Sequence, residues 1–216
     1  MVKAAGKGHI DVVKFCAKNG ATDFNHAMVE AAKYGHIDIV KFCVQMGAAY
    51  FDGAMLAACK KGCINMIKYC AENGATTFDR AMVESAYYGH IDVVKFCAEN
   101  GATDFNNAMT LAAPYGHIDM VKFCAEQGAT KFNEAMWKAA INGHIDIVKF
   151  CAENGAITFD KTMWKAARGG YIDIVKYCAA HWGYADVVKF CTEQGGRSTN
   201  FYIKQAMGHV ARWGQV

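Results

Sequence analysis

The residues of this chain that could do chemistry are its cysteines and histidines, and most of them recur at fixed positions. Where thiolates or imidazoles converge, they can hold zinc or attack a substrate. Five histidines follow the glycine of a repeated segment, and eight of the ten cysteines occupy one position of that segment. These residues are His9, His36, His90, His117 and His144, and Cys16, Cys43, Cys70, Cys97, Cys124, Cys151, Cys178 and Cys191.

A repeated position argues against a catalytic or metal-binding cluster. Neighbouring helices of stacked repeats lie about 8–10 Å apart, whereas a disulfide spans no more than about 7 Å between α-carbons. We therefore predict that the eight cysteines are reduced core residues. Cys59 and Cys63 give a weak hint of a metal site, but no histidine or cysteine with fitting spacing lies nearby. The repeated histidines have no partnering carboxylate or cysteine, so we expect them to make a turn hydrogen bond.

The sequence also excludes several function classes. No Ser/His/Asp or Cys/His arrangement and no phosphate-binding glycine loop stands out, so we expect no enzymatic activity, no cofactor and no metal. The net charge of +3 is too small to favour nucleic acid. No apolar run approaches the roughly 18 residues of a membrane span, and Met1–Gly6 lacks the apolar core of a signal peptide. We expect an intracellular protein, cytoplasmic or nuclear.

The element that positions these residues is a repeat of 27 residues. Near-copies of Gly143–Cys151 recur along the chain, and a fixed period in this range is typical of a stacked-repeat protein. A hydrophobic content of 53% and a single proline fit a packed helical chain. The copies begin at Gly8, Gly35, Gly62, Gly89, Gly116 and Gly170.

The repeat from Asn133 to Phe159 predicts two short helices. Asn133 is a candidate N-cap of the first helix, which Gly143 ends because a left-handed residue is needed there. The same N-cap place holds Asn25, Asp52, Asp79, Asn106 and Asp160. Ala135, Met136, Ala139 and Ala140 form the buried stripe of this helix.

The second helix of this repeat ends at Gly155. Its predicted inner face holds Ile145, Val148 and Cys151, with Ile147 and Phe150 beside them. Asp146 and Lys149 are predicted to form a solvent pair. Phe159 stands before the next cap and is predicted to pack on Trp164 as a hydrophobic staple. Nothing in the unit alternates with period two, so the fold class is an all-α solenoid of stacked helix-turn-helix repeats.

We expect a single domain over residues 1–216. Met1 falls where Met28 falls in the next repeat, which leaves two interpretations: an N-terminal helix that frays, or a piece of a longer array. We expect Pro114 to end its helix early. The predicted parts are a truncated repeat at 1–24, five complete repeats at 25–159, irregular repeats with a deletion of fourteen residues at 160–200, and a C-terminal cap at 201–216. In the irregular part we predict one helix over Tyr171–Trp182, a turn at Gly183 and a reversed helix near Ala185–Glu193.

The segments Ala139–Val148 and Gly155-Ala156 resemble the ankyrin repeat, which has an Ala-Ala pair, Gly-His, a Val-Val pair and Gly-Ala at these spacings. The resemblance covers nearly the whole chain. The period is 27 residues rather than the family's roughly 33, and the missing residues are those that form the projecting β-hairpin finger. The family's Thr-Pro-Leu-His is absent too. The chain looks most like the short variants in multigene families of large DNA viruses, which implies a viral protein acting in a host cell.

What the resemblance implies is a non-enzymatic module that binds another protein, with only its helical face and loops as candidates because the fingers are missing. The positions that vary most between repeats combine aromatic, basic and small residues, as interfaces do. The candidate contact surface lies on the concave side of the first helices. Its residues are Tyr87, Tyr88, Tyr115, Trp137, Lys138, Trp164, Lys165 and Arg168.

Two alternatives remain open at this point. Trp137 and Trp164 could be no more than staples on Phe132 and Phe159, and the whole chain could be a structural fragment or spacer with no binding site of its own. The excess of basic residues lies in residues 133–216, which favours an acidic or phosphorylated protein partner. We expect a monomer that binds neither nucleic acid nor membranes.

Overall fold

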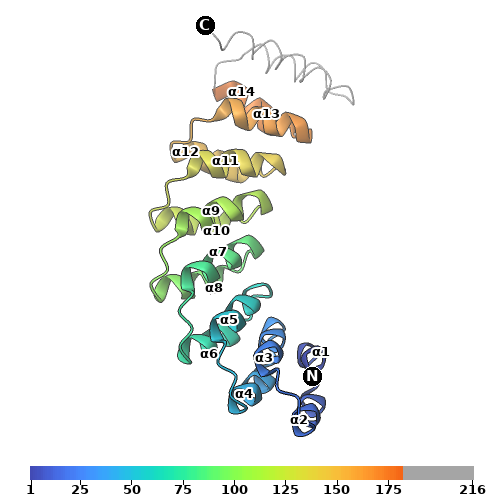
Figure 1. Cartoon of the computed structure of the whole chain (residues 1–216). Coiled ribbons are helices and arrows are strands. Elements are labelled where there is room, and N and C mark those ends of the chain that lie inside the picture. Colours follow the sequence, from blue (N-terminus) through green and yellow to red (C-terminus); the bar gives the residue numbers. More distant parts are fainter. Residues whose placement is uncertain (182–216) are drawn as a thin grey trace. The chain divides into compact units, whose positions relative to one another are not determined.

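The structure is a computed structural model that describes residues 1–181 (Figure 1). Within this range all regular secondary structure is helical and there is no strand. The described part of the chain therefore has no β-hairpin finger. The predicted all-α solenoid of helical repeats is confirmed. The chain divides into two compact units, Met1–Ala108 and Met109–Val216, which we describe separately. The finer boundaries, from the truncated repeat at 1–24 to the cap at 201–216, stay predictions.

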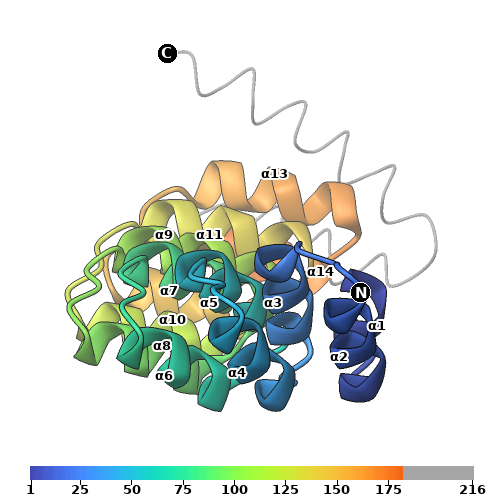
Figure 2. The same cartoon turned by 60° about the horizontal axis from the view of Figure 1, so that its bottom comes forward.

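The N-terminal unit (Met1–Ala108) is built of helix pairs. The first helices of the pairs contact one another in chain order, and the second helices form another layer (Figure 2). The first helices are α1 (Val2–Gly6), α3 (Phe24–Lys33), α5 (Phe51–Cys59) and α7 (Phe78–Tyr88), and the second helices are α2 (Ile10–Lys18), α4 (Ile37–Gln45), α6 (Ile64–Glu72) and α8 (Ile91–Glu99). Helix α9 (Phe105–Ala112) begins at the end of this unit.

The C-terminal unit (Met109–Val216) repeats the same arrangement. Pro114 ends α9 early, as predicted, and a 3-10 turn, η1 (Ala113–Tyr115), follows. Helices α11 and α13 contact each other in one layer, and α10, α12 and α14 form the other. Their bounds are α10 (Ile118–Glu126), α11 (Phe132–Ile141), α12 (Ile145–Glu153), α13 (Phe159–Gly169) and α14 (Ile172–His181). Of the helix predicted over Tyr171–Trp182, α14 is the described part; the turn at Gly183, the reversed helix and the cap lie outside the described residues.

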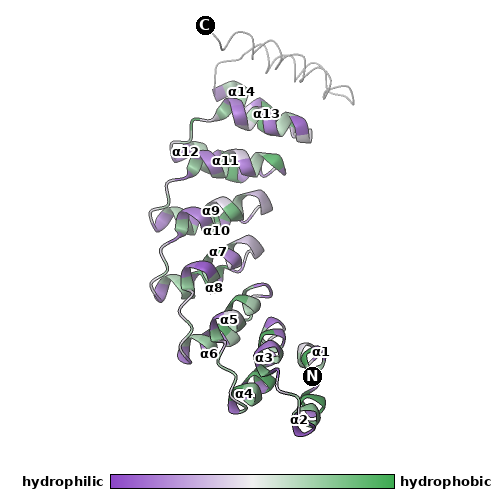
Figure 3. Ribbon diagram, viewed as in Figure 1, coloured by the Kyte–Doolittle hydropathy of each residue, from purple (hydrophilic) through white to green (hydrophobic). Residues whose placement is uncertain are grey.

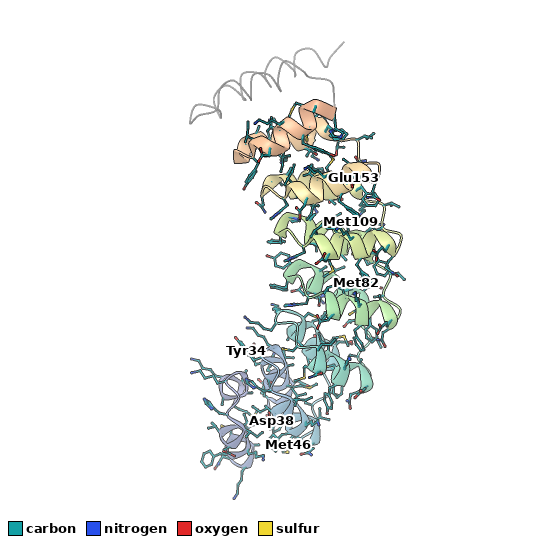
Figure 4. The ribbon with its side chains drawn as sticks, turned by 180° about the vertical axis from the view of Figure 1, so that it is seen from behind. Tyr34, Asp38, Met46, Met82, Met109 and Glu153 are labelled. Carbon is teal, nitrogen blue, oxygen red and sulfur yellow. The ribbon has the colours of Figure 1, made fainter. Side chains whose placement is uncertain are left out.

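The core of each repeat consists of small and flexible apolar side chains. Most of the longer helices carry both hydrophilic and hydrophobic residues (Figure 3), and Met82, labelled in Figure 4, is fully buried. In the repeat of α11 and α12 the buried residues are Ala135, Met136, Ala139, Ala140, Ile147, Val148 and Cys151. The prediction that Ile145 lines the inner face was wrong, because Ile145 begins α12 and stays half-buried while Ile147 takes that place.

The glycine that ends each first helix has two physical reasons to be glycine. Gly8 has a φ of 77°, in the left-handed region that disfavours other residues. A Cβ built on Gly8 would also lie 2.7 Å from Cε1 of His36, which belongs to the next repeat. Gly62 is in the same position against the ring of His90. The turn glycine therefore allows the following repeat to approach closely.

The predicted N-caps have a different role, and this prediction was wrong. Helix α11 begins one residue before Asn133, and no side chain caps it. Oδ1 of Asn133 instead accepts hydrogen bonds from the backbone N–H groups of Ile157 and Thr158, at 2.8 and 3.2 Å. Asn25, Asp52 and Asp79 accept from the backbone 24 and 25 residues further on in the same way. We call these contacts the inter-repeat clamps.

The predicted hydrophobic staple is also replaced by a longer-range contact. Phe132 begins α11 and packs edge-to-face on Phe150 of α12, with ring centroids 6.4 Å apart. Phe159, predicted to pack on Trp164, stacks on His181 at 5.3 Å. Phe24 and Phe78 pack on Phe42 and Phe96 in the same way, so in these four repeats the phenylalanine ties its first helix to the second helix of its own repeat.

The second-helix lysines likewise contact the next repeat. Asp146 and Lys149 form no ion pair in the described structure, so the predicted solvent pair was wrong. Nζ of Lys149 lies 5.8 Å from the ring centroid of Tyr177, which is one repeat further on. Lys41 and Lys68 make the equivalent contact with Tyr69 and Phe96, at 5.7 Å in both cases. Such cation–π contacts at the surface are worth about 0.5–1 kcal/mol each.

The clamps give a first testable prediction. Asp52 accepts from N–H of Thr76, from N–H of Thr77 and from Oγ1 of Thr77. We expect Asp52→Ala to lower the free energy of unfolding by about 1–2 kcal/mol, measured by urea denaturation at neutral pH. Asp52→Asn keeps an acceptor oxygen, as Asn25 and Asn133 do, and should lose less than half as much. Equal losses in the two variants would contradict the clamp.

The stability that the Asp52 clamp contributes should also depend on pH. The N–H of Thr76 holds the pKa of Asp52 below its ordinary value of 3.8. Because the folded pKa is depressed, the carboxylate stabilises the fold above pH 3.8, and this contribution is lost as the pH falls through the folded pKa. Asp52→Asn should therefore be relatively less sensitive to acid than the wild type.

A second prediction concerns the only described buried side chain whose polar atom has no hydrogen-bond partner. Oγ of Ser85 is such an atom by hydrogen-bond geometry, although it lies near the Cys59 thiol; other repeats have alanine at this position of α7. A buried unpaired hydroxyl costs about 1–3 kcal/mol, so Ser85→Ala should stabilise the protein by about 1 kcal/mol in thermal or chemical unfolding. The control is Thr162→Ala, which removes a buried hydroxyl that donates to the carbonyl of Thr158 at 2.7 Å and should destabilise. Destabilisation by both variants would contradict this explanation.

Candidate functional site

Six of the eight repeated cysteines are buried in the core, whereas Cys16 is only half-buried and Cys191 lies outside the described residues. Cys43, Cys97 and Cys151 are fully buried. Burial raises the pKa of the Cys43 thiol to about 11 and that of Cys151 to about 12, so these thiols stay protonated near neutral pH. Sγ of Cys59 donates to the carbonyl of Met55 at 3.2 Å, and burial raises its pKa to about 11. Among residues 1–181, no three His, Cys, Asp or Glu side chains are grouped so that they could hold a metal ion.

Among the repeated histidines, His144 shows a bond to the neighbouring repeat instead of one within its own turn. His144 precedes α12, and its Nε2 donates to the carbonyl oxygen of Pro114 at 3.1 Å, one repeat back. Nδ2 of Asn142 donates to the same oxygen at 2.6 Å. The predicted hydrogen bond within the turn was therefore wrong, because the partner of His144 belongs to the preceding repeat. The contact still gives His144 a structural role.

The tyrosines of the candidate set lie at the ends of first helices. Tyr87 and Tyr88 end α7 in the N-terminal unit, are 36% and 39% exposed, and contact each other edge-to-face with centroids 4.8 Å apart. Tyr88 also stacks on His90 at 6.3 Å. In the C-terminal unit the exposed Tyr115 stacks on His117, also at 6.3 Å. These rings shield the turn histidines and still present a face to solvent, as does Tyr34, labelled in Figure 4.

The N-terminal unit has a groove on its first helices that the candidate set did not include. It measures about 350 Å³ and lies over α5, between long side chains of α3 and α7. Small residues form its floor, because Gly53 and Ala57 occupy positions where other first helices have longer side chains. Glu30 and Glu84 line it together with Lys33, Lys60 and Arg80, so its walls carry both signs of charge. The signal in the sequence was the two small residues at variable positions.

The other five candidate residues come together on α11 and α13. Together with Lys161 they form what we call the indole–cation cluster. Trp164 is 44% exposed, and Nζ of Lys165 lies 4.9 Å from its ring centroid and 5.6 Å from that of Trp137. The guanidinium carbon of Arg168 lies 4.8 Å from the ring of Trp164. The members are Trp137, Lys138, Lys161, Trp164, Lys165 and Arg168.

Lys161 is the member that sequence reasoning did not select. Its Nζ lies 3.9 Å from the ring centroid of Trp137. Lys161 occupies the variable position after the clamp residue, where the other repeats have His26, Gly53, Arg80, Asn107 and Glu134. The variation was visible in the sequence, but contact with a tryptophan 24 residues earlier depends on how α13 packs on α11.

One carboxylate pairs with the cluster. Oε1 of Glu134 lies 2.8 Å from Nζ of Lys138, one turn along α11. The hydrogen bond from Lys138 holds the pKa of Glu134 below its ordinary value, with further help from the charges of Lys131 and Lys161. Glu134 is thus ionised at neutral pH and offsets one of the four positive charges.

None of the described helices is both long enough and apolar enough to cross a membrane.

Comparisons with known proteins agree with the geometry. The family model for ankyrin repeats (three copies) matches residues 84–162 and 109–195, which together span more than half of the chain. Among solved structures, the human ASB11 ankyrin repeat domain is similar, with a TM-score of 0.60 and 19% sequence identity over 72% of this chain and 83% of that one. At this identity the likeness shows the fold alone. No curated protein matches the chain significantly.

The burial of the thiols gives a third prediction. With a maleimide reagent at about pH 8, Cys16 and Cys63, which are partly exposed, should react before any fully buried cysteine, because reagent and base must reach the thiol. Peptide mapping after labelling would measure this order. The fully buried set is Cys43, Cys59, Cys70, Cys97, Cys124, Cys151 and Cys178.

Intact mass supplies the complementary measurement. We expect all ten cysteines to be reduced and free of metal, so the native and denatured masses should agree with the sequence. Fast labelling of the buried set in the folded protein, bound zinc, or a loss of two mass units per pair of cysteines would each contradict the prediction.

Proposed function

The chain belongs to the ankyrin-repeat family. We propose that it is a non-enzymatic module that binds another protein through the solvent-exposed side of its first helices, the side expected from the sequence to be concave. Ankyrin repeats are generally protein–protein interaction modules. The short repeat lacks a finger in every described copy, so the helix face and the loops are the surfaces left for binding.

The observation that carries this proposal is the indole–cation cluster. Tryptophan and arginine are over-represented among residues that dominate binding energy. Trp164 keeps 44% of its surface exposed, and Phe159, its expected staple partner, stacks on His181 instead. An exposed tryptophan surrounded by cations is suited to binding. We propose Tyr87, Tyr88, Tyr115 and the cluster residues Trp137, Lys138, Trp164, Lys165 and Arg168 as contact residues.

The charge of this surface favours an acidic or phosphorylated partner over a neutral one, because opposite potentials steer association and select partners. An origin in the multigene families of large DNA viruses, an intracellular site of action and a monomeric state stay predictions.

The alternative is a structural spacer within a longer array. It draws support from the inter-repeat clamps, which link each repeat to the next and would serve a spacer equally well. A spacer has no binding surface of its own, so the two functions differ in what the exposed first-helix side chains do.

The fourth prediction separates the two functions. The full chain is used to capture a partner from host-cell extract, and the affinity for that purified partner is measured for wild type and for Trp164→Ala with Lys165→Glu. We expect binding to weaken by at least about 2 kcal/mol, roughly thirtyfold in Kd. The free energy of unfolding should change by no more than about 1 kcal/mol, because Trp164 is exposed and Lys165 is only half-buried.

The matched control is Ile157→Ala with Lys149→Glu. It removes one exposed apolar side chain and reverses one charge in the same unit, but on a loop and a second helix. It should bind normally. If the Trp164 and Lys165 variant binds with unchanged affinity per folded molecule but is less stable, the result would support Trp164 as a staple and the chain as a spacer instead.

A further inference from the structure

The indole–cation cluster holds more positive charge than its own residues neutralise. Three ammonium groups surround the ring of Trp137: Nζ of Lys161 at 3.9 Å, of Lys165 at 5.6 Å and of Lys138 at 5.9 Å. Lys165 and Arg168 flank the ring of Trp164 at 4.9 and 4.8 Å. Within the described residues, Glu134 is the one carboxylate in an ion pair with the cluster, at Lys138.

The indole rings explain how like charges can be kept together. A cation over an aromatic face gains about 0.5–2 kcal/mol from the ring quadrupole, which partly offsets the repulsion between neighbouring ammonium groups. The rings also fix the directions of long, flexible side chains before any ligand arrives. Because the cations are placed in advance, an anionic ligand would lose less entropy of ordering on binding.

The arrangement discriminates between kinds of anion. A phosphate dianion is best held where several donors converge on one point, preferably with arginine forks. Here the point on which three lysines converge is filled by the indole of Trp137, and the cluster has a single arginine. Along α13 the cations follow at Lys161, Lys165 and Arg168, so they spread over about 10 Å of one helix face. Anions can therefore sit only around the rim, separated from one another.

Stacked nucleobases fit this surface less well than separated carboxylates. Single-stranded nucleic acid binds by laying bases on free aromatic faces. One face of Trp137 is approached to 3.9 Å by an ammonium group of the protein itself, and Trp164 is flanked by Lys165 and Arg168.

We propose that the indole–cation cluster of α11 and α13 is a docking site for a polypeptide segment rich in aspartate and glutamate, whose separated carboxylates pair with Lys161, Lys165 and Arg168. The proposal rests on the proposed function and adds the chemistry of the partner and a particular site.

The fifth prediction tests the site with defined probes and the full chain. A labelled glutamate-rich peptide is titrated by fluorescence anisotropy, next to a peptide of the same length in which every glutamate is glutamine. The glutamate peptide should bind and the glutamine peptide should not. The affinity of the glutamate peptide should fall as salt is raised, because the ion pairs between its carboxylates and the cluster are exposed to solvent. Lys161→Glu with Lys165→Glu should reduce the affinity at least about tenfold, the effect of losing roughly 1.4 kcal/mol.

The control variant is Lys122→Glu with Lys149→Glu, which makes the same charge change in the same unit on second helices. It should retain binding; an equal loss would mean general charge attraction and would overturn the site. A phosphoserine peptide or a single-stranded oligonucleotide that binds more tightly than the glutamate peptide would overturn the choice of ligand. If the captured partner depends on the first helices while the glutamate peptide does not bind, this inference fails and the proposed function stands.

Discussion

The fold depends on one hydrogen-bonded contact between consecutive repeats. The second residue of a first helix, an asparagine or aspartate, accepts from two backbone N–H groups at the entry to the next first helix, as Asn133 does from Ile157 and Thr158. The helices span only 9 to 11 residues in the complete repeats with clamps, and helices this short are marginal in water alone. No side chain caps them. The start of each helix pair is therefore fixed by the pair before it, and the repeats stabilise one another.

Close approach between repeats determines which side chains remain available for binding. Turn glycines such as Gly8 and Gly62 accept the rings of His36 and His90, and alanines of the first helices fill the interface without bulk. The second helices use their lysines to cover aromatic rings of the next repeat. The outward positions of the first helices take no part in these recurring contacts, which explains why the groove over α5 and the indole–cation cluster can differ so much in chemistry.

The period and the residue types were sufficient to predict the helical repeats, their glycine turns, the buried cysteines and the early end of α9 at Pro114. They were insufficient wherever a side chain contacts a distant segment of the chain, whether in its own repeat or in the next. Asn133 looks like a cap in its own sequence context, Phe159 like a staple and Lys149 like the partner of Asp146, because local rules consider only neighbours within a turn. In the structure the backbone donors and rings that they meet lie 22 to 28 residues away along the chain. Lys161 was missed for the same reason, since its tryptophan belongs to the preceding repeat.

The clamp also has a genetic consequence. Its donor and acceptor are 24 or 25 residues apart, which is less than one period of 27. The acceptors Asn25, Asp52, Asp79 and Asn133 all meet an equivalent pair of backbone donors. Unequal recombination between two copies of the coding segment therefore joins an acceptor to matching donors wherever within the period the exchange occurs. A gene of this kind can gain or lose whole repeats without creating an unmatched junction, and new outward side chains can then diversify on a framework that is already stable.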